Sequence, residues 1–354
     1  MKKIVCIILL ISIFISYFAF NRNGANVIEE INLSYNFEER LSDYLQFPTQ
    51  HRQYKSEITE KKIVEQMKNA IEKADEWEMG TVSDVATVEL KKIILHELNI
   101  GFLLNNIDKE KLIVITVAEV NHDRYFEREL IFKDVHVGEF HVRLLIPKQQ
   151  SRPLPAIVGL HGHNESNVDF RDKYRGKDLV QAGFVVIMPS FRAAQVEWPE
   201  NTDDNRISRE LFLNGFTLLG LRCYEVLLLV KYLKYMNEVD NKKIGIIGHS
   251  MGSVIAILVS RMSSDIKAIT RDCLCEFINV VGLEVASLGK NSYIDSLHCE
   301  TVLSLSHYTT AINDEKTLSI PVLTVPYGFN SKKDRQAIGE FFLKFLKFDN
   351  RFYK

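Results

Sequence analysis

The second half of the chain alternates short apolar runs with longer amphipathic stretches. Five of these runs are almost continuously apolar and have Gly, Ser, His or Asp at one of their last two positions, namely residues 154–163, 183–191, 242–250, 265–273 and 320–329. Continuous rather than alternating hydrophobicity predicts strands that are covered on both faces, and therefore a parallel sheet. Helical patterns lie between the runs, the clearest over residues 218–235 and the last over residues 334–346. This alternation predicts a doubly wound, mostly parallel α/β domain whose ligands bind at the carboxyl ends of the strands.

The part of the chain before these runs divides into two regions. Residues 111–147 hold three stretches that are rich in β-branched residues and separated by polar breaks, which predicts strands at an antiparallel edge of the sheet. Earlier residues show two series of apolar positions at helical spacing: Ile63, Met67, Ile71 and Ala74, and then Val88, Leu90, Ile94 and Leu98. We therefore expect a helical extension over residues 23–110 and an α/β domain over residues 111–354.

The first residues form a separate pattern. Lys2 and Lys3 precede an almost uninterrupted apolar run over residues 4–20, which is the arrangement of an export signal. The run is long for a signal peptide and slightly short for a membrane span, and no A-x-A cleavage site follows it. Residues 1–22 are interpreted as a cleaved signal peptide or an uncleaved membrane anchor. Either interpretation places the body outside the cytoplasm, secreted or attached to the membrane through residues 4–20.

Composition narrows the classes of function. Of the 354 residues, 46% are hydrophobic and 25% are charged, and the formal net charge of −2 does not favour a nucleic-acid partner. The sequence holds no glycine-rich phosphate loop and no convincing metal-ligand spacing, since Cys273-x-Cys275 is too tight for a common zinc site. We therefore expect neither a cofactor nor a metal. Export would allow disulfides to persist, and a bridge from Cys299 to Cys273 or to Cys275 stays open.

A G-x-S-x-G pentapeptide, Gly248 to Gly252, joins one of the apolar runs to a helical pattern. Such a sharp junction of strand and helix holds a serine in a strained backbone conformation and exposes its hydroxyl above the sheet. Glycine is needed at both ends because a Cβ there would collide with the neighbouring strand or helix. The pattern predicts that Ser250 is a nucleophile and that the Met251 N–H, at the helix N-terminus, faces a developing oxyanion. The alternative is a chance serine in a turn.

A second element, GLHGHNES, ends the first of the five runs at residues 159–166. Residues 128–346 resemble the α/β-hydrolase superfamily, particularly its acetyl xylan esterase and dienelactone hydrolase-like branches. The resemblance rests on this element, the pentapeptide, the helical pattern before the pentapeptide and the closing helix. The resemblance implies that His163, the residue after His-Gly, supplies a second oxyanion N–H. The alternative for its side chain is an exposed loop position. His249 occupies the variable position of the pentapeptide and is interpreted as structural.

The triad histidine departs from the pattern of the superfamily. A serine hydroxyl needs a histidine to take its proton, and the order along the chain is serine, acid, histidine. Only His298 and His307 follow Ser250, whereas the loop after the last predicted strand, residues 326–333, carries Tyr327 and no histidine. Three explanations stay open: one of these histidines acts from a rearranged segment, the site is degenerate, or the strand order or the base is different. We prefer His298, because carboxylates flank it; for either histidine, the alternative is a position in a loop or in the core.

Strand position selects the acid. The strand predicted after the serine ends at Asp272, and some hydrolases carry their acid at that strand end, whereas the last predicted strand offers no carboxylate at its tip. Asp272 is therefore the first choice and Glu276 the second. The alternative for Asp272 is a surface carboxylate that pairs with Arg271.

Together these features predict an exported or membrane-anchored serine hydrolase that cleaves a carboxylic ester. The substrate class, a small-molecule or acylated saccharide ester, is suggested only by the resemblance. Residues 191–215 follow a strand end and mix aromatic with charged side chains, so we expect them to form a lid or a rim. Two rivals stay open: a serine peptidase of the same fold, and a non-catalytic binding protein with this fold, which the missing histidine supports.

Overall fold

The structure is a computed structural model, and it describes a defined set of residues. These are residues 87–105, 107, 112–148, 153–163, 165–192, 211, 215–273, 305, 308–325, 329 and 331–346. The predicted export segment and most of the predicted helical extension lie outside the described residues. Among the helices that are described, none is both long enough and apolar enough to cross a membrane.

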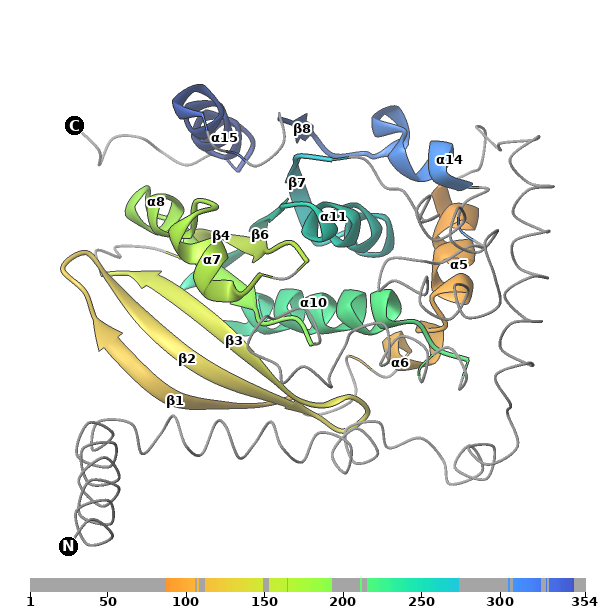
Figure 1. Ribbon diagram of the computed structural model, residues 1–354, viewed down its shortest axis with the longest axis horizontal. Helices are drawn as coiled ribbons and strands as arrows, with labels where there is room; N and C mark the ends of the chain where they lie inside the picture. Colours follow the sequence, from red (N-terminus) through yellow and green to blue (C-terminus); the bar gives the residue numbers. More distant parts are fainter. Residues whose placement is uncertain are drawn as a thin grey trace, which may run out of the picture. The chain divides into compact units, whose positions relative to one another are not determined.

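A mixed sheet of eight strands forms the centre of the described part (Figure 1). The strands are β1 (Ile113–Asn121), β2 (Tyr125–Asp134), β3 (Gly138–Pro147), β4 (Leu154–Leu160), β5 (Val185–Pro189), β6 (Val239–Gly248), β7 (Ile266–Arg271) and β8 (Val322–Thr324). Their order across the sheet is β1-β2-β3-β5-β4-β6-β7-β8. The pairs from β1 to β5 are antiparallel, and those from β5 to β8 are parallel. The predicted fold class is therefore confirmed.

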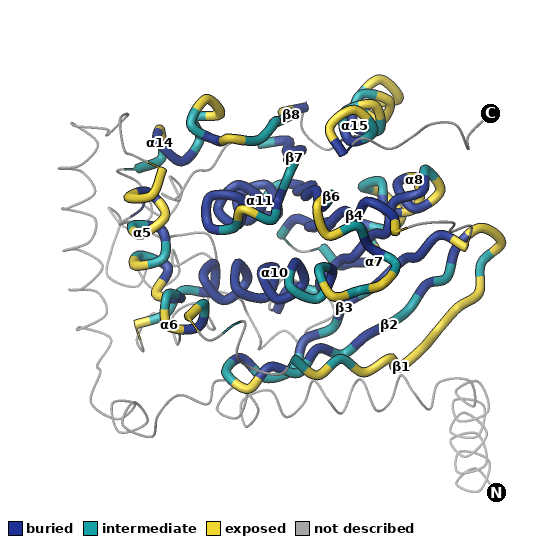
Figure 2. The backbone as a smooth tube through the Cα atoms, turned by 180° about the vertical axis from the view of Figure 1, so that it is seen from behind, coloured by how far each residue is buried: buried dark blue, intermediate teal, exposed yellow. Residues whose placement is uncertain are grey.

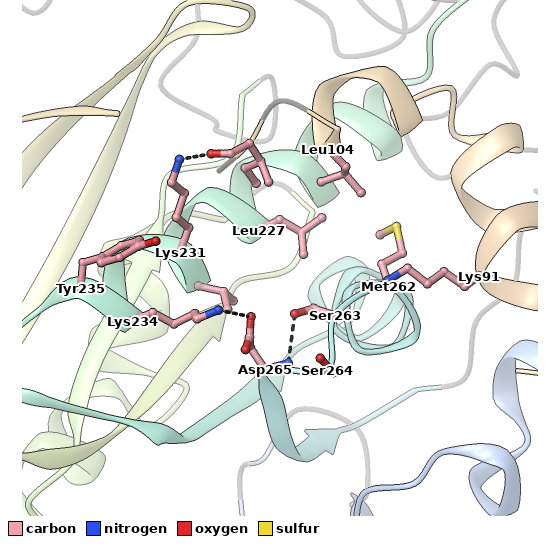
Figure 3. A pocket seen from close by; sticks show the side chains of 12 residues that line it. Lys91, Leu104, Leu227, Lys231, Lys234, Tyr235, Met262, Ser263, Ser264 and Asp265 are labelled. Atoms are coloured by element: carbon pink, nitrogen blue, oxygen red, sulfur yellow. Dashed lines mark hydrogen bonds and ion pairs between the residues drawn. The ribbon is translucent and has the colours of Figure 1, made fainter. Parts of the chain in front are cut away.

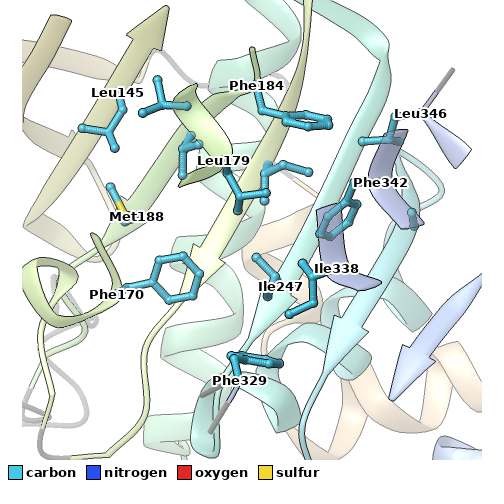
Figure 4. Close-up of a cluster of buried hydrophobic side chains, with 14 of the residues drawn as sticks. Leu145, Phe170, Leu179, Phe184, Met188, Ile247, Phe329, Ile338, Phe342 and Leu346 are labelled. Carbon is cyan, nitrogen blue, oxygen red and sulfur yellow. The ribbon is translucent and has the colours of Figure 1, made fainter. Parts of the chain in front are cut away.

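Helices cover both faces of the sheet. They are α5 (Thr87–Glu97), α6 (Gly101–Leu104), α7 (Asn167–Asp172), α8 (Gly176–Gln181), α10 (Leu218–Tyr235), α11 (Met251–Met262), α14 (Thr309–Asn313) and α15 (Lys332–Phe345), with a 3-10 turn at Glu315–Thr317. The helices α7, α8 and α15 share one apolar cluster that contains Phe170, Leu179 and Phe342 (Figure 4). On the opposite face α10 and α11 pack against β6 and against each other.

The helices α10 and α11 are buried along most of their length (Figure 2). All 12 residues of α11 are buried, in keeping with its apolar sequence around the whole helix. The helix α5, from the predicted extension, packs against α11 through Leu90 and Ile94, whereas Val88 faces solvent. The helical spacing was thus read correctly here, except that Val88 does not belong to the buried face.

Candidate active site

The turn between β6 and α11 holds Ser250 in an unusual backbone conformation, with φ 50° and ψ −119°. A Cβ on Gly248 would lie 2.1 Å from the Gly252 carbonyl oxygen, and a Cβ on Gly252 would lie 2.4 Å from the Leu160 carbonyl oxygen on β4. Both separations are far below any real contact, so only glycine fits at either end of the turn. The steric reason for the G-x-S-x-G pattern is therefore confirmed, and the role of Ser250 as nucleophile stays a prediction.

Asp272 follows β7 and is buried against the serine turn. Its Oδ1 accepts hydrogen bonds from the Ser250 N–H at 2.8 Å and from the Ser253 hydroxyl at 2.9 Å, while its Oδ2 contacts His249 Nδ1. The alternative of a surface carboxylate paired with Arg271 is wrong. Arg271 instead bonds Asn313 at 2.8 Å and the Glu315 carboxylate at 3.2 Å.

The His249 side chain lies in a buried polar cluster beside the serine. Its ring stacks on Tyr174, with the ring centroids 4.1 Å apart and the planes inclined by 20°, and its Nε2 lies 3.8 Å from Glu165 Oε1. The Tyr174 hydroxyl donates to the same oxygen of Glu165. Burial and the neighbouring Glu165 raise the pKa of Tyr174, so its hydroxyl stays a neutral donor. The ring of Phe329, which is also buried, lies 6.1 Å from the His249 ring.

The loop after β4, where the second oxyanion donor was predicted, is held by His161. The Phe191 N–H donates to His161 Nε2 at 3.1 Å, so Nδ1 must carry the ring proton and donate to the Gly162 carbonyl oxygen at 2.8 Å. That carbonyl belongs to the same planar trans peptide as the His163 N–H, which therefore points the opposite way. Burial, helped by the charge of Arg222, lowers the pKa of His161 to about 4 and keeps the ring neutral.

A buried charged cluster lies behind Met251. The Arg222 guanidinium is 2.8 Å from Met251 Sδ and also donates to the Arg192 carbonyl oxygen at 2.7 Å. The Arg192 guanidinium is itself 2.7 Å from the buried Glu225 carboxylate. Burial raises the pKa of Glu225, against the lowering effect of the two arginines. Two guanidinium groups beside one carboxylate leave positive charge next to the residue whose N–H is expected to face an oxyanion, which favours negative charge there.

Several predicted site residues lie outside the described residues: Glu276, His298, His307, Tyr327 and positions 193–210 of the predicted lid. The structure brings Ser250, Met251 and Asp272 together and places His163 on the neighbouring loop. Sequence reasoning missed Glu165 and Tyr174. A signal for Glu165 was present, because a carboxylate two residues after the His-Gly-His stretch stands at the carboxyl edge of the sheet. Within the described part of the chain, no group of three His, Cys, Asp or Glu side chains could hold a metal ion.

A cavity of about 250 Å³ lies away from this cluster (Figure 3). Its lining includes Lys231, Lys234, Met262 and Asp265 at or just after the C-terminal ends of α10 and α11, and Lys91 on α5. Ser250 precedes the first residue of α11 and Met262 is its last, so the 12-residue helix separates them by about 18 Å. The cavity is therefore not part of the site at Ser250.

Comparisons with known proteins agree with this architecture. Residues 140–270 match the model of the Dienelactone hydrolase family. Acetyl Xylan Esterase 1 from Thermoanaerobacterium sp. JW/SL YS485 is 14% identical, covering 77% of this chain and 98% of its own, with a TM-score of 0.53. The acetyl xylan esterase from Paenibacillus sp. R4 is 13% identical, covering 71% and 94%, also with a TM-score of 0.53. Methylesterase BT1017 is 13% identical, covering 76% and 65%, with a TM-score of 0.50.

No protein with curated function matches the sequence. At these identities the structural likenesses establish the α/β-hydrolase fold, and the resemblance deduced from the motifs is confirmed.

Proposed function

We propose that this esterase-like α/β-hydrolase cleaves carboxylic esters through an acyl-enzyme on Ser250. The observation that carries the proposal is the turn itself: a serine at positive φ, whose backbone N–H is held by the buried carboxylate of Asp272. A turn of this kind presents a hydroxyl at the carboxyl edge of the sheet, beside the N-terminus of α11. The structural neighbours named above, two acetyl xylan esterases and a methylesterase, support the proposal.

In the proposed reaction Ser250 Oγ attacks the acyl carbon, and its proton passes to a histidine. The ester C–O bond then breaks, and the histidine gives this proton to the alcohol that leaves. The Met251 and His163 N–H groups hold the oxyanion, with the positive charge of Arg222 behind Met251. Water, which loses a proton to the same histidine, then attacks the acyl carbon; the bond to Ser250 Oγ breaks, the acid is released and Oγ regains the proton. For the base we retain His298, with His307 as the alternative and Asp272 as the acid.

The names of the structural neighbours support a proposal for the substrate class. Two are acetyl xylan esterases and one is a methylesterase, so we propose a small ester or an acylated saccharide as substrate. We further propose that residues 1–22 export the protein or anchor it to the membrane. Joining these residues to a reporter that is active only outside the cytoplasm tests the second statement, and a well-expressed but silent fusion contradicts it.

The test of the nucleophile compares Ser250→Ala with an exposed control, Ser264→Ala. Turnover of short acyl esters and labelling by a fluorophosphonate, which reacts quickly only with an activated serine, should fall by several orders of magnitude in Ser250→Ala alone. Retention of most of the wild-type turnover in Ser250→Ala contradicts the proposal.

A second candidate, a non-catalytic binding protein, is favoured by one observation. The sequence from the end of β8 to residue 354 contains no histidine, and Asp272 already contacts His249 through Oδ2. His298→Ala and His307→Ala distinguish the candidates. Loss of turnover in one variant alone identifies the base, and a wild-type protein that neither turns over esters nor labels favours the binding protein.

A further inference from the structure

An unbroken series of contacts joins the serine turn to the oxyanion loop. It begins at the Ser250 N–H, which donates to Asp272 Oδ1 at 2.8 Å, and continues from Asp272 Oδ2 to His249 Nδ1. On its far side His249 Nε2 lies 3.8 Å from Glu165 Oε1. Glu165 Oε2 in turn accepts the Gly162 N–H at 2.8 Å. The imidazole of His249 therefore stands between two carboxylates, each of which holds a backbone N–H of a different loop.

The chemistry of imidazole fits this position. Both ring nitrogens face carboxylate oxygens: Nδ1 contacts Asp272 Oδ2, and Nε2 lies 3.8 Å from Glu165 Oε1, beyond hydrogen-bond distance but within the range of an ion pair. The side chains of His249 and Glu165 are 7% and 17% exposed, so water screens their attraction poorly. The groups that face the ring are Asp272 after β7, Glu165 after β4 and the stacked Tyr174 between α7 and α8; His161, at the end of β4, also acts on it electrostatically.

We propose that His249 and Glu165 are positioning residues, whose imidazole–carboxylate bridge fixes the oxyanion loop relative to Ser250. The proposal rests on the proposed function, because the two loops matter together only if their Met251 and His163 N–H groups share one oxyanion. Donors to an oxyanion must lie about 2.7–3.1 Å from it. A displacement of about 1 Å at one donor lowers the rate by about 100-fold.

Two substitutions remove the bridge and leave its neighbouring hydrogen bonds. Glu165→Gln keeps an oxygen that can accept the Gly162 N–H but loses the negative charge. His249→Asn keeps an amide donor that can serve Asp272, as Nδ1 does, but does not reach Glu165. The matched control is Glu119→Gln on β1, whose carboxylate pairs with Arg128 at the exposed edge of the sheet.

The kinetic test measures kcat and KM for a short acyl ester and the rate of fluorophosphonate labelling. Each bridge variant should lose about 10- to 100-fold in kcat and in labelling with KM changed less than threefold, because the oxyanion forms only in the transition state. The double variant should be no slower than the slower single variant, and Glu119→Gln should match wild type. Wild-type kcat in Glu165→Gln, or losses that multiply in the double variant, overturn the proposal.

A second measurement does not depend on activity. The urea midpoints of wild type, the two single variants and the double variant form a cycle, and the shift of the double should be clearly smaller than the sum of the single shifts. Additive shifts overturn the bridge whether or not the protein is a hydrolase. If the midpoints of the cycle are coupled but the wild-type protein neither labels nor turns over esters, the proposed function is rejected and the bridge is retained as the link between the two loops.

Discussion

At the scale of single residues, the buried His161 ring makes the free energy of unfolding depend on pH. Its Nε2 is occupied by the Phe191 N–H and its Nδ1 by the Gly162 carbonyl oxygen, so a second ring proton would have to displace the Phe191 N–H. With its pKa lowered to about 4 in the folded chain, the ring takes up a proton more readily after unfolding.

The sign of the resulting pH effect follows from proton linkage. Between the unfolded pKa of about 6.5 and the folded pKa of about 4, the unfolded chain binds more protons, so the free energy of unfolding falls as the pH falls through this range. The largest loss from this ring is about 3 kcal/mol, at and below pH 4. Urea unfolding of wild type and His161→Asn at several pH values measures it. The slope between pH 6.5 and 4 should decrease in the variant, and an unchanged slope assigns it to other groups.

At the scale of elements, the buried carboxylate of Glu127 ties β2 to β3 and α7. It accepts from Arg143 on β3, from Arg171 on α7 at 2.6 Å and from His122 at 2.9 Å. Burial alone would raise the pKa of Glu127, but the hydrogen bonds from Arg171 and Arg143 outweigh it, and the pKa is lowered. Its stabilising contribution is therefore present above the unfolded pKa near 4.5 and is lost as the pH falls through the lower folded value.

Removing the charge of Glu127 should weaken the contacts among β2, β3 and α7 and so destabilise the fold. Glu127→Gln leaves two arginines facing a neutral group, and we expect the free energy of unfolding at pH 7 to fall by about 3 kcal/mol. The exposed control Glu119→Gln should change it by less than about 1 kcal/mol. The variant should also lose less stability than wild type on going below pH 4.5. Equal unfolding free energies for Glu127→Gln and wild type would show that the network contributes nothing to folding.

Elements were the part of the fold that the sequence predicted best. The apolar runs marked every parallel strand. Both faces of β4 are covered, since all seven of its residues are buried, whereas no residue of the edge strand β8 is buried. The bounds of α10 agree with its apolar pattern, since a Thr217 side chain caps its first turn by accepting the Gly220 N–H at 2.9 Å. Periodicity could not decide the outward position of Val88, because that depends on how α5 meets α11.

The candidate site was only partly accessible from the sequence. Ser250 and Asp272 could be chosen because each stands at the end of a strand, and parallel strands bring such ends to one edge. The contacts of Glu165 and Tyr174 with His249 could not, since they join loops that are far apart in the chain and depend on side-chain direction. For the same reason the sequence did not reveal that Asp272 holds the serine turn through Oδ1.

At the scale of the whole molecule, β1 is an exposed edge. Ile113, Ile115 and Val117 are between 40% and 50% exposed, and no charged residue occurs between Ile113 and Ala118. Among the described strands, β1 pairs only with β2. An uncharged, β-branched edge offers unpaired backbone groups to another strand, and natural proteins usually protect such edges with a charge.

We therefore expect Val117→Lys to lower self-association. Light scattering at rising protein concentration should begin at a higher concentration than in wild type, with the free energy of unfolding changed by less than about 0.5 kcal/mol. Val88→Lys introduces the same charge at an exposed position on α5 and should leave the scattering unchanged. Equal scattering by Val117→Lys and wild type would mean that this edge does not limit solubility.

The positive φ of Ser250 implies a trade-off between stability and reactivity. A non-glycine residue in this region of backbone space destabilises the folded state by about 1–3 kcal/mol, and glycine avoids this strain. Glycine, however, loses about 0.5–1 kcal/mol more in chain entropy on folding. Ser250→Gly should therefore be more stable than Ser250→Ala by about 1 kcal/mol in urea unfolding, and equally inert toward esters. Equal stability of the two variants would show that the strain at this turn is no larger than the chain entropy that glycine loses, about 0.5–1 kcal/mol. If the difference is found, the chain carries at this turn a residue that is less stable than glycine, which is expected where function needs the hydroxyl and stability is lowered in return.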